Sequence, residues 1–473
     1  MMRWPGSPAR ALDALVVVIL IQFVVGWASG LFPRLTAIDF YQYWGVSVAW
    51  RASDHALGGP YTNHQGYRAV LRDLAAQSDE PKLAAVSRAM PRPSFTATPF
   101  LYMLFGALPA SYTRAVAVFY TLQVVLFLAG VVLLGRLYRF RLFPLSCLAP
   151  LLLVSSGPLL ADLRVGNLGS LQFAALTALL VLAVRLSNAA RATVLGGVVL
   201  TGLVLLLLAK PNVALITPLM VGHLWLRRGS RFLAVVTIPA LALGAAAVLI
   251  SQRYFHSWTV WLEWYEFVYG RNPAGLARPS AGGNYSTSLL LAGLIHLDVR
   301  TAAVVIAAVL SASLIAVIVM STPASRAMAL LPRVLNGVFG DVRLAMGIGI
   351  VLTIALPPLC WYHYQVIALI PGLWLLSVAS GSSDPRLWGL AALVLSSGLL
   401  NTLFLPLGWN GAAELIATLS WIPLWAGILF QLASAGAQEP GAGAAPSGES
   451  GPDERRTKKG RARRSRRSRA PVS

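Results

Sequence analysis

Apolar runs rich in Leu, Val and Ala alternate with short polar breaks along most of the sequence. A helix of about 20 apolar residues is long enough to cross roughly 30 Å of hydrocarbon at about 1.5 Å per residue. The pattern therefore predicts an all-α, polytopic membrane protein with about twelve spans within residues 1–432. These spans are expected at residues 12–32, 115–134, 143–160, 168–184, 192–208, 213–226, 232–250, 301–320, 344–360, 364–380, 387–404 and 412–432.

The segments outside these apolar runs are predicted to form two outer loops, a non-spanning piece and a tail. Residues 33–94 and 251–300 are too polar for the membrane core and are predicted to form two long outer loops, the first with helical segments on the membrane surface. Residues 95–109 contain Pro99 and end at Pro109, which is typical of a re-entrant or interfacial piece. Residues 433–473 are rich in Gly, Ala, Pro and Ser and then strongly basic, which predicts a disordered cytoplasmic tail.

Composition agrees with a membrane location. The chain is 57% hydrophobic and 12% charged, with a mean hydropathy of +0.68, which excludes a water-soluble enzyme. A net charge of +21 would suggest a nucleic-acid partner in a soluble protein. Here the basic residues lie mainly in short loops and the tail, so no nucleic-acid partner is expected. Cys147 and Cys360 lie far apart in apolar runs and indicate neither a disulfide framework nor a metal site.

The distribution of basic residues predicts the topology. With an inside N-terminus, the short inside segments hold fourteen arginines and the short outside segments hold three basic residues, Arg114, Arg164 and Lys210. Both termini are therefore predicted to be cytoplasmic, in a multi-pass protein of the cell (plasma or inner) membrane. Ten Lys and Arg residues in the tail would bind anionic inner-leaflet lipid, or would only aid solubility and fix the topology.

Polar and ionisable residues gather at the predicted outer ends of the spans. Ionisable groups at membrane depth are costly and are usually paired or functional, so this convergence predicts a site on the outer face. The residues concerned are Asp39, Asp162, Arg164, Asn167, Lys210, Asn284 and His363.

Asp39 is the candidate general base. It directly precedes an aromatic cluster that includes Phe40 and Tyr43. A carboxylate at a partly apolar boundary has its charged form disfavoured, so its pKa rises toward a value useful to a base. Alternatively, Asp39 caps a helix that starts at Phe40, and the aromatic residues are interfacial anchors.

Three residues are candidates for binding a phosphate. Lys210 interrupts an apolar run before Pro211, and its compact ammonium suits a phosphate partner, although a lysine here could also snorkel to the interface. Arg164 adds a second cation unless Asp162 neutralises it. His363 could donate a hydrogen bond to phosphate or shuttle a proton, or could belong to an aromatic belt at the interface.

Several short motifs carry a resemblance to a known family. They are the Asp39-aromatic motif, Pro99-Phe100, Gly166-Asn167, Ala209-Lys210-Pro211, Gly283-Asn284-Tyr285-Ser286 and Trp361-Tyr362-His363-Tyr364. In the order of these motifs, and in their common predicted side of the membrane, residues 10–432 resemble glycosyltransferase family 87, a group of GT-C type membrane enzymes. The chain departs from the family pattern at Ala97-Thr98-Pro99, at Gly166-Asn167 with Gln172 further on, and at Tyr364, where the family has a second histidine.

The resemblance implies a GT-C type helical bundle and an inverting sugar transfer. The donor would be a polyprenyl-phosphate-linked sugar, with mannose favoured and arabinofuranose possible, and the acceptor a glycolipid or polysaccharide hydroxyl on the outer face. Asp39 would be the general base. We expect Lys210, Arg164 and His363 to bind the donor phosphate. Substrate contacts are expected from Tyr43, Asn167, Gln172, Asn284 and Tyr362.

The same residues bear on cofactors and on two other classes of membrane protein. No cofactor is expected, and no metal ligand is assigned. Metal dependence stays open, because the outer loops contain acidic residues but no spacing that defines a ligand set. A membrane transporter or lipid-linked-sugar flippase would show inverted repeats and ionisable residues near the bilayer midplane. An O-antigen ligase or polymerase type enzyme would concentrate its polar residues in one late outer loop.

Overall fold

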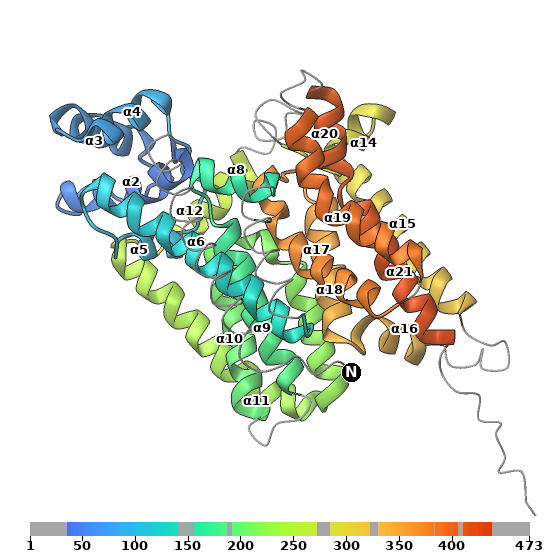
Figure 1. The fold of residues 1–473 in the computed structure, drawn as a ribbon. Helices are drawn as coiled ribbons and strands as arrows, with labels where there is room; N and C mark the ends of the chain where they lie inside the picture. The colour runs from blue at the N-terminus through green and yellow to red at the C-terminus, as the bar shows by residue number, and fades with distance from the viewer. Residues whose placement is uncertain are drawn as a thin grey trace, which may run out of the picture.

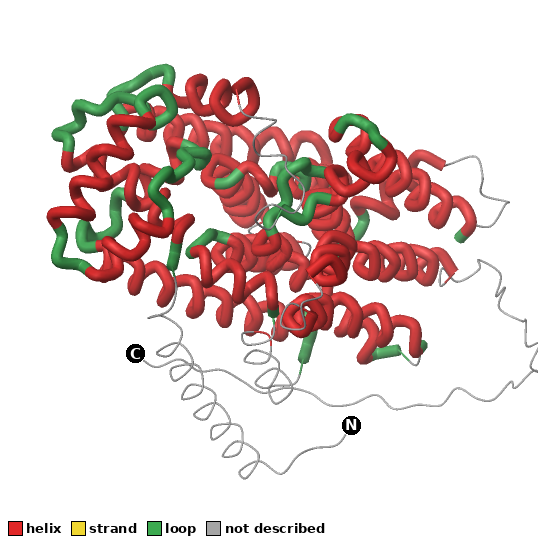
Figure 2. Tube along the Cα trace, turned by 90° about the horizontal axis from the view of Figure 1, so that it is seen from above, coloured by secondary structure: helices red, strands yellow, loops and turns green. Residues whose placement is uncertain are grey.

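The chain is all-helical in the part that the structure describes. The computed structural model describes residues 36–140, 152, 156–186, 192–271, 284–321, 330–382, 384–404 and 410–437. Within them, Figure 2 shows helices joined by loops and no strand. The predicted first span, most of the run at 143–160 and nearly all of the basic tail lie outside the described residues.

Seven helices in the described ranges are long and apolar enough to cross a membrane. A further pair, α16 (Leu330–Phe339) and α17 (Val342–Ala355), is bent by 86° and adds an eighth if it is one span. The chain is therefore a polytopic helical membrane protein, and the count of twelve spans stays a prediction. The seven are α6 (Tyr112–Leu137), α9 (Gly169–Leu186), α10 (Ala192–Ala209), α11 (Ile216–Tyr254), α15 (Val299–Met320), Tyr362–Ser380 and Leu415–Ser434.

The 39 residues of α11 form two helices joined at a kink, and together they hold about twice the roughly 20 residues that one span needs. Gly229 breaks α11 with φ 81° and ψ 170°, a backbone conformation that glycine adopts without steric cost. Ile216, before the break, packs on α17 at Gly349, whereas Phe232, after the break, packs on α10 at Gly196. Gly229 thus divides α11 between the two apolar runs that the sequence predicts.

Short helices cover one end of the bundle. Figure 1 shows α2, α3, α4 and α8 at the end of the bundle opposite the lower end of α11. Helix α5 has seven residues, about 10 Å, which is too short to cross a membrane and agrees with the non-spanning prediction for residues 95–109. The short helices are α2 (Ile38–Ala52), α3 (His64–Gln77), α4 (Pro81–Ala89), α5 (Pro99–Phe105) and α8 (Gly157–Val165).

The second predicted outer loop also contains helices. They are α12 (Val260–Tyr265), the π-helical turn η3 (Glu266–Arg271) and α14 (Thr287–Ile295). Ser286 caps α14 by accepting a hydrogen bond from the backbone N–H of Leu289 at 3.3 Å.

The C-terminal part completes the bundle. A 3-10 segment, η5 (Tyr362–Ala368), leads directly into α18 (Leu369–Ser380). Three helices follow, and the last continues beyond residue 432, where the sequence predicts that the membrane domain ends. They are α19 (Pro385–Phe404), α20 (Asn410–Leu419) and α21 (Trp421–Ala437).

Candidate active site

A cavity of about 1420 Å³ lies where the short helices meet the ends of the long ones. Its walls come from α2, residues 94–98, α8, the turn after α10, the α12–η3 segment and residues 357–364. Seven of the nine predicted site residues line it: Asp39, Tyr43, Arg164, Asn167, Lys210, Tyr362 and His363. Residues more than 300 positions apart in the sequence therefore share one cavity.

Asp39 lies in the first turn of α2. The helix starts at Ile38, and the residue before it, Ala37, makes no side-chain cap, so the alternative that Asp39 caps a helix is wrong. Phe40 and Trp44 on the same helix are 0% and 1% exposed, so these two aromatic residues belong to the core rather than to an interfacial belt. Packing of this aromatic face fixes α2 and leaves Asp39 at the cavity wall.

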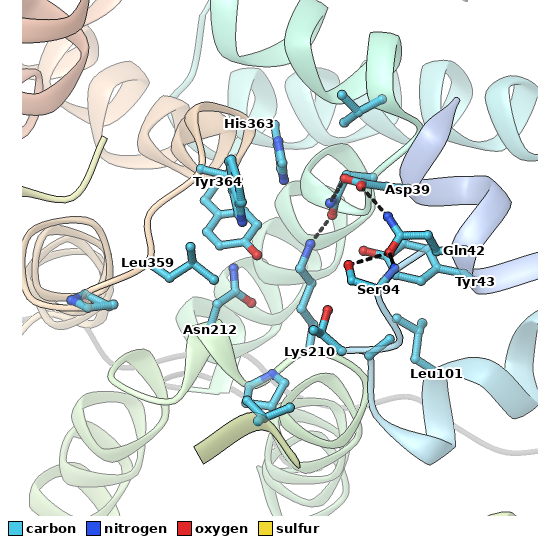
Figure 3. A pocket seen from close by; sticks show the side chains of 18 of the residues that line it. Asp39, Gln42, Tyr43, Ser94, Leu101, Lys210, Asn212, Leu359, His363 and Tyr364 are labelled. Carbon is cyan, nitrogen blue, oxygen red and sulfur yellow. Dashed lines mark hydrogen bonds between the residues drawn. The ribbon is translucent and has the colours of Figure 1, made fainter. Parts of the chain in front are cut away.

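The carboxylate of Asp39 accepts two hydrogen bonds. Gln42 Nε2 donates to Oδ1 at 3.2 Å, and Asn167 Nδ2 donates to Oδ2 at 2.6 Å. Gln42 is held in turn, because its Oε1 accepts from the Ser94 backbone N–H at 3.0 Å and hydroxyl at 2.8 Å (Figure 3). Burial raises the pKa of Asp39, and the contacts with Asn167 and Lys210 oppose the rise. The carboxylate is therefore both oriented and made more basic than an exposed one.

Lys210 enters the cavity from the end of α10. The helix stops at Ala209 because Pro211 cannot continue it, and Lys210 has extended backbone. The Thr98 hydroxyl donates to the Ala209 carbonyl at 3.2 Å, which ties this end to residues 94–98.

The ammonium of Lys210 is buried against polar and aromatic partners. The residue is 8% exposed, and its Nζ donates to Asn167 Oδ1 and lies 4.6 Å from the centre of the Tyr364 ring (Figure 3). The snorkelling alternative is therefore wrong. Burial lowers the pKa of Lys210 to about 8, with Asp162 and Asp39 opposing the fall.

Asp162 supports the site rather than neutralising Arg164. Its buried carboxylate accepts from the backbone N–H groups of Gly169 and Ser170, both at 2.8 Å, and from Gln123 Nε2 at 3.2 Å. It thereby caps the start of α9, and burial raises its pKa to about 6. Among the described residues the ion-paired carboxylates are Asp73 and Asp341, so the alternative that Asp162 neutralises Arg164 is wrong. Arg164 is exposed and lines the cavity.

His363 faces the cavity from η5. It is 6% exposed, and its Nε2 has no hydrogen-bond partner among the described residues. The Trp361 ring lies parallel to the imidazole with centroids 6.5 Å apart, and the Tyr364 ring meets it edge-on at 4.8 Å. A buried imidazole held between aromatic rings does not fit the alternative of an interfacial belt residue.

Asn284 and Gln172 do not line the cavity, contrary to the prediction that they contact substrate. Asn284 Nδ2 donates to the Pro358 carbonyl at 3.1 Å, and its Oδ1 accepts from the Cys360 N–H at 2.9 Å. Gln172 is buried and exchanges two hydrogen bonds with Asn212, at 2.7 and 3.3 Å. Both amides are satisfied within the protein, so they support the cavity wall from behind.

The sequence interpretation missed Gln42, Ser94 and Asn212 as cavity residues. Gln42 follows Asp39 by three positions, a spacing that places two side chains on one helical face, so a signal was present. Asn212 follows Lys210 by two positions in a turn, and Ser94 has no local sequence signal.

The described residues contain no group of three or more His, Cys, Asp and Glu that could hold a metal ion. No protein-family model matches the chain, and neither a curated protein nor a solved structure matches it. The case for a function therefore depends on the geometry of the cavity and on the motifs of the sequence.

Proposed function

We propose that this protein is an inverting membrane glycosyltransferase with a GT-C type bundle of about twelve spans. It transfers a sugar from a polyprenyl-phosphate donor to a hydroxyl of a glycolipid or polysaccharide. The observation that carries the proposal is that a basic carboxylate, Asp39, and a buried ammonium, Lys210, line one cavity with a single amide between them.

The two groups suit a displacement at the anomeric carbon, one acting on the attacking hydroxyl and the other on the leaving phosphate. Asp39 accepts the proton of the acceptor hydroxyl as its oxygen bonds to that carbon. The bond from the carbon to the donor phosphate breaks, and its electron pair leaves with the polyprenyl phosphate. Lys210 stabilises the negative charge that develops on the phosphate. A phosphate leaving group needs little protonation at neutral pH, so one carboxylate suffices.

The other cavity residues fit this division of roles. Arg164 adds a second cation for the phosphate, and His363 adds an imidazole to the wall of the same cavity. Tyr43 and Tyr362 offer aromatic and hydroxyl surface to the sugars. A cavity at the end of an apolar bundle lets the polyprenyl tail stay in hydrocarbon while the phosphosugar reaches the polar groups.

The proposal places this cavity on the outer face of the cell membrane, with both termini in the cytoplasm and the basic tail against anionic inner-leaflet lipid. Mannose is the first sugar to test and arabinofuranose the second. The positive-inside count of the sequence supports the orientation.

The test is sugar transfer by the purified protein in liposomes that contain an acceptor lipid extract. Polyprenyl-phosphate donors labelled in mannose or arabinofuranose are supplied, and the anomeric configuration of the product is determined. We expect labelled, inverted product with wild type and with Asp73→Asn, an exposed carboxylate of α3 outside the cavity. Movement of labelled lipid across the bilayer without transfer would instead indicate a flippase and overturn the proposal.

A further inference from the structure

One amide, that of Asn167, separates the carboxylate of Asp39 from the ammonium of Lys210. Its Nδ2 donates to Asp39 Oδ2 at 2.6 Å, and its Oδ1 accepts from Lys210 Nζ. A carboxylate only accepts hydrogen bonds and an ammonium only donates them, so the orientation of the amide is forced. The carboxylates that form ion pairs among the described residues are those of Asp73 and Asp341. Asp39 and Lys210 therefore form no direct ion pair.

The backbone around Asn167 holds this amide in place. The N–H groups of Gly166 and Asn167 both donate to the Asp162 carbonyl, at 2.9 and 3.1 Å. Gly166 has φ 68°, and a Cβ on it would lie 2.8 Å from Phe40 Cβ, so glycine is required there. Asn167 Oδ1 also accepts the N–H of Leu168 at 2.7 Å. The amide is therefore a fixed spacer.

We propose that Asn167 is a positioning residue that keeps base and cation apart and so sets the pH range in which the site works. This inference rests on the proposed function for its catalytic meaning. Without the spacer, Lys210 reaches Asp39 and forms a direct ion pair. The pair stabilises both charged forms, which makes the carboxylate a weaker base and holds the ammonium away from a phosphate.

Other ionisable groups face this pair from each neighbouring element, and none of them is altered in the variants below. They are Asp162 and Arg164 of α8, Tyr43 of α2, Tyr120 of α6, and His363 and Tyr364 of η5.

The direct test measures the pH dependence of Lys210 acylation by a small water-soluble anhydride, read by mass spectrometry of the full-length protein in liposomes. Acylation requires the neutral amine, so its midpoint reports the pKa of Lys210. We expect Asn167→Ala to raise the midpoint by about one pH unit, because the ammonium then contacts a carboxylate. Asn167→Gln keeps an amide and should restore much of the wild-type value.

The matched control is Asn212→Ala, which removes a cavity amide that does not lie between the two charges. Its midpoint should stay near that of wild type. An unchanged or lowered midpoint in Asn167→Ala, with wild-type thermal stability, would overturn the inference. If Asn167→Ala does not fold, Asn167→Ser, which is too short to bridge both partners, carries the same expectation and the same contrary result.

A second readout separates this inference from the proposed function. In Asn167→Ala the acid limb of the transfer rate should move to lower pH and the alkaline limb to higher pH, whereas a merely structural role would lower the rate at every pH. Absence of transfer by wild type would contradict the proposed function. The labelling midpoint would still decide the role of Asn167 as a spacer.

Discussion

Asn167 and Asn284 are two buried asparagines, and both follow a glycine in motifs that the sequence interpretation assigns to substrate. Asn167 bonds to two charged side chains inside the cavity. Asn284 bonds to the backbone of Pro358 and Cys360 and forms an isolated extended bridge with Trp361. The first amide organises charge, whereas the second holds a wall segment in place.

The difference shows that a buried amide is not by itself evidence of a binding role. Every buried polar group needs a partner, and most find one in the backbone. An amide whose partners are ionisable side chains is the more informative case, because it couples groups whose charge can change. Variants of the two regions should therefore separate loss of chemistry from loss of stability.

The largest effect is expected from Asp39→Asn. An amide cannot accept the acceptor proton, so transfer should fall by about 10²- to 10⁴-fold while donor binding persists. The measurement is product formation alongside equilibrium binding of labelled donor. Asp73→Asn serves as the control, and substantial turnover by Asp39→Asn would remove this carboxylate from the mechanism.

Lys210→Ala should weaken donor affinity by about ten- to a hundredfold, because a charge-assisted contact with phosphate is lost. Titration of donor analogue into protein in nanodiscs measures this. Lys82→Ala, on α4 outside the cavity, is the matched control. Equal donor affinity in the two variants would show that Lys210 has only a packing role.

The transfer rate should be bell-shaped in pH. It falls on the acid side as pH drops through the raised pKa of Asp39, because the protonated carboxyl cannot accept a proton. It falls on the alkaline side above about pH 8, because Lys210 loses its charge. In Lys210→Arg the guanidinium stays charged, so any residual activity should lack that alkaline limb. An unchanged limb would assign it to another group.

The smallest effect on chemistry is expected from Asn284→Ala. The buried Cys360 N–H loses its acceptor, which should lower the free energy of unfolding by about 1–3 kcal/mol. Turnover per folded molecule should stay close to that of wild type. Thermal unfolding and active-fraction assays measure the two quantities, and a rate loss without a stability loss would place Asn284 in the catalytic machinery.

The sequence predicts the helical membrane class and the gathering of the main site residues at one end. Apolar run length and the alternation of spans are enough to place Asp39, Lys210 and His363 at a common rim. The roles of individual amides are not predictable in this way, because their partners are distant in sequence: Gln172 meets Asn212, and Asn284 meets Cys360. The burial of Lys210 depends on Asn167 and Tyr364 arriving from other segments.

The central claim is that a phosphosugar binds between Lys210 and Asp39. Its most direct test is a cryo-EM structure of the protein with a non-transferable polyprenyl-phosphonate sugar. The account predicts the phosphonate within hydrogen-bond distance of Lys210 Nζ, with the anomeric carbon between it and the Asp39 side of the cavity. A phosphonate bound outside the cavity, or seated against Asp39 with Lys210 unengaged, would contradict it.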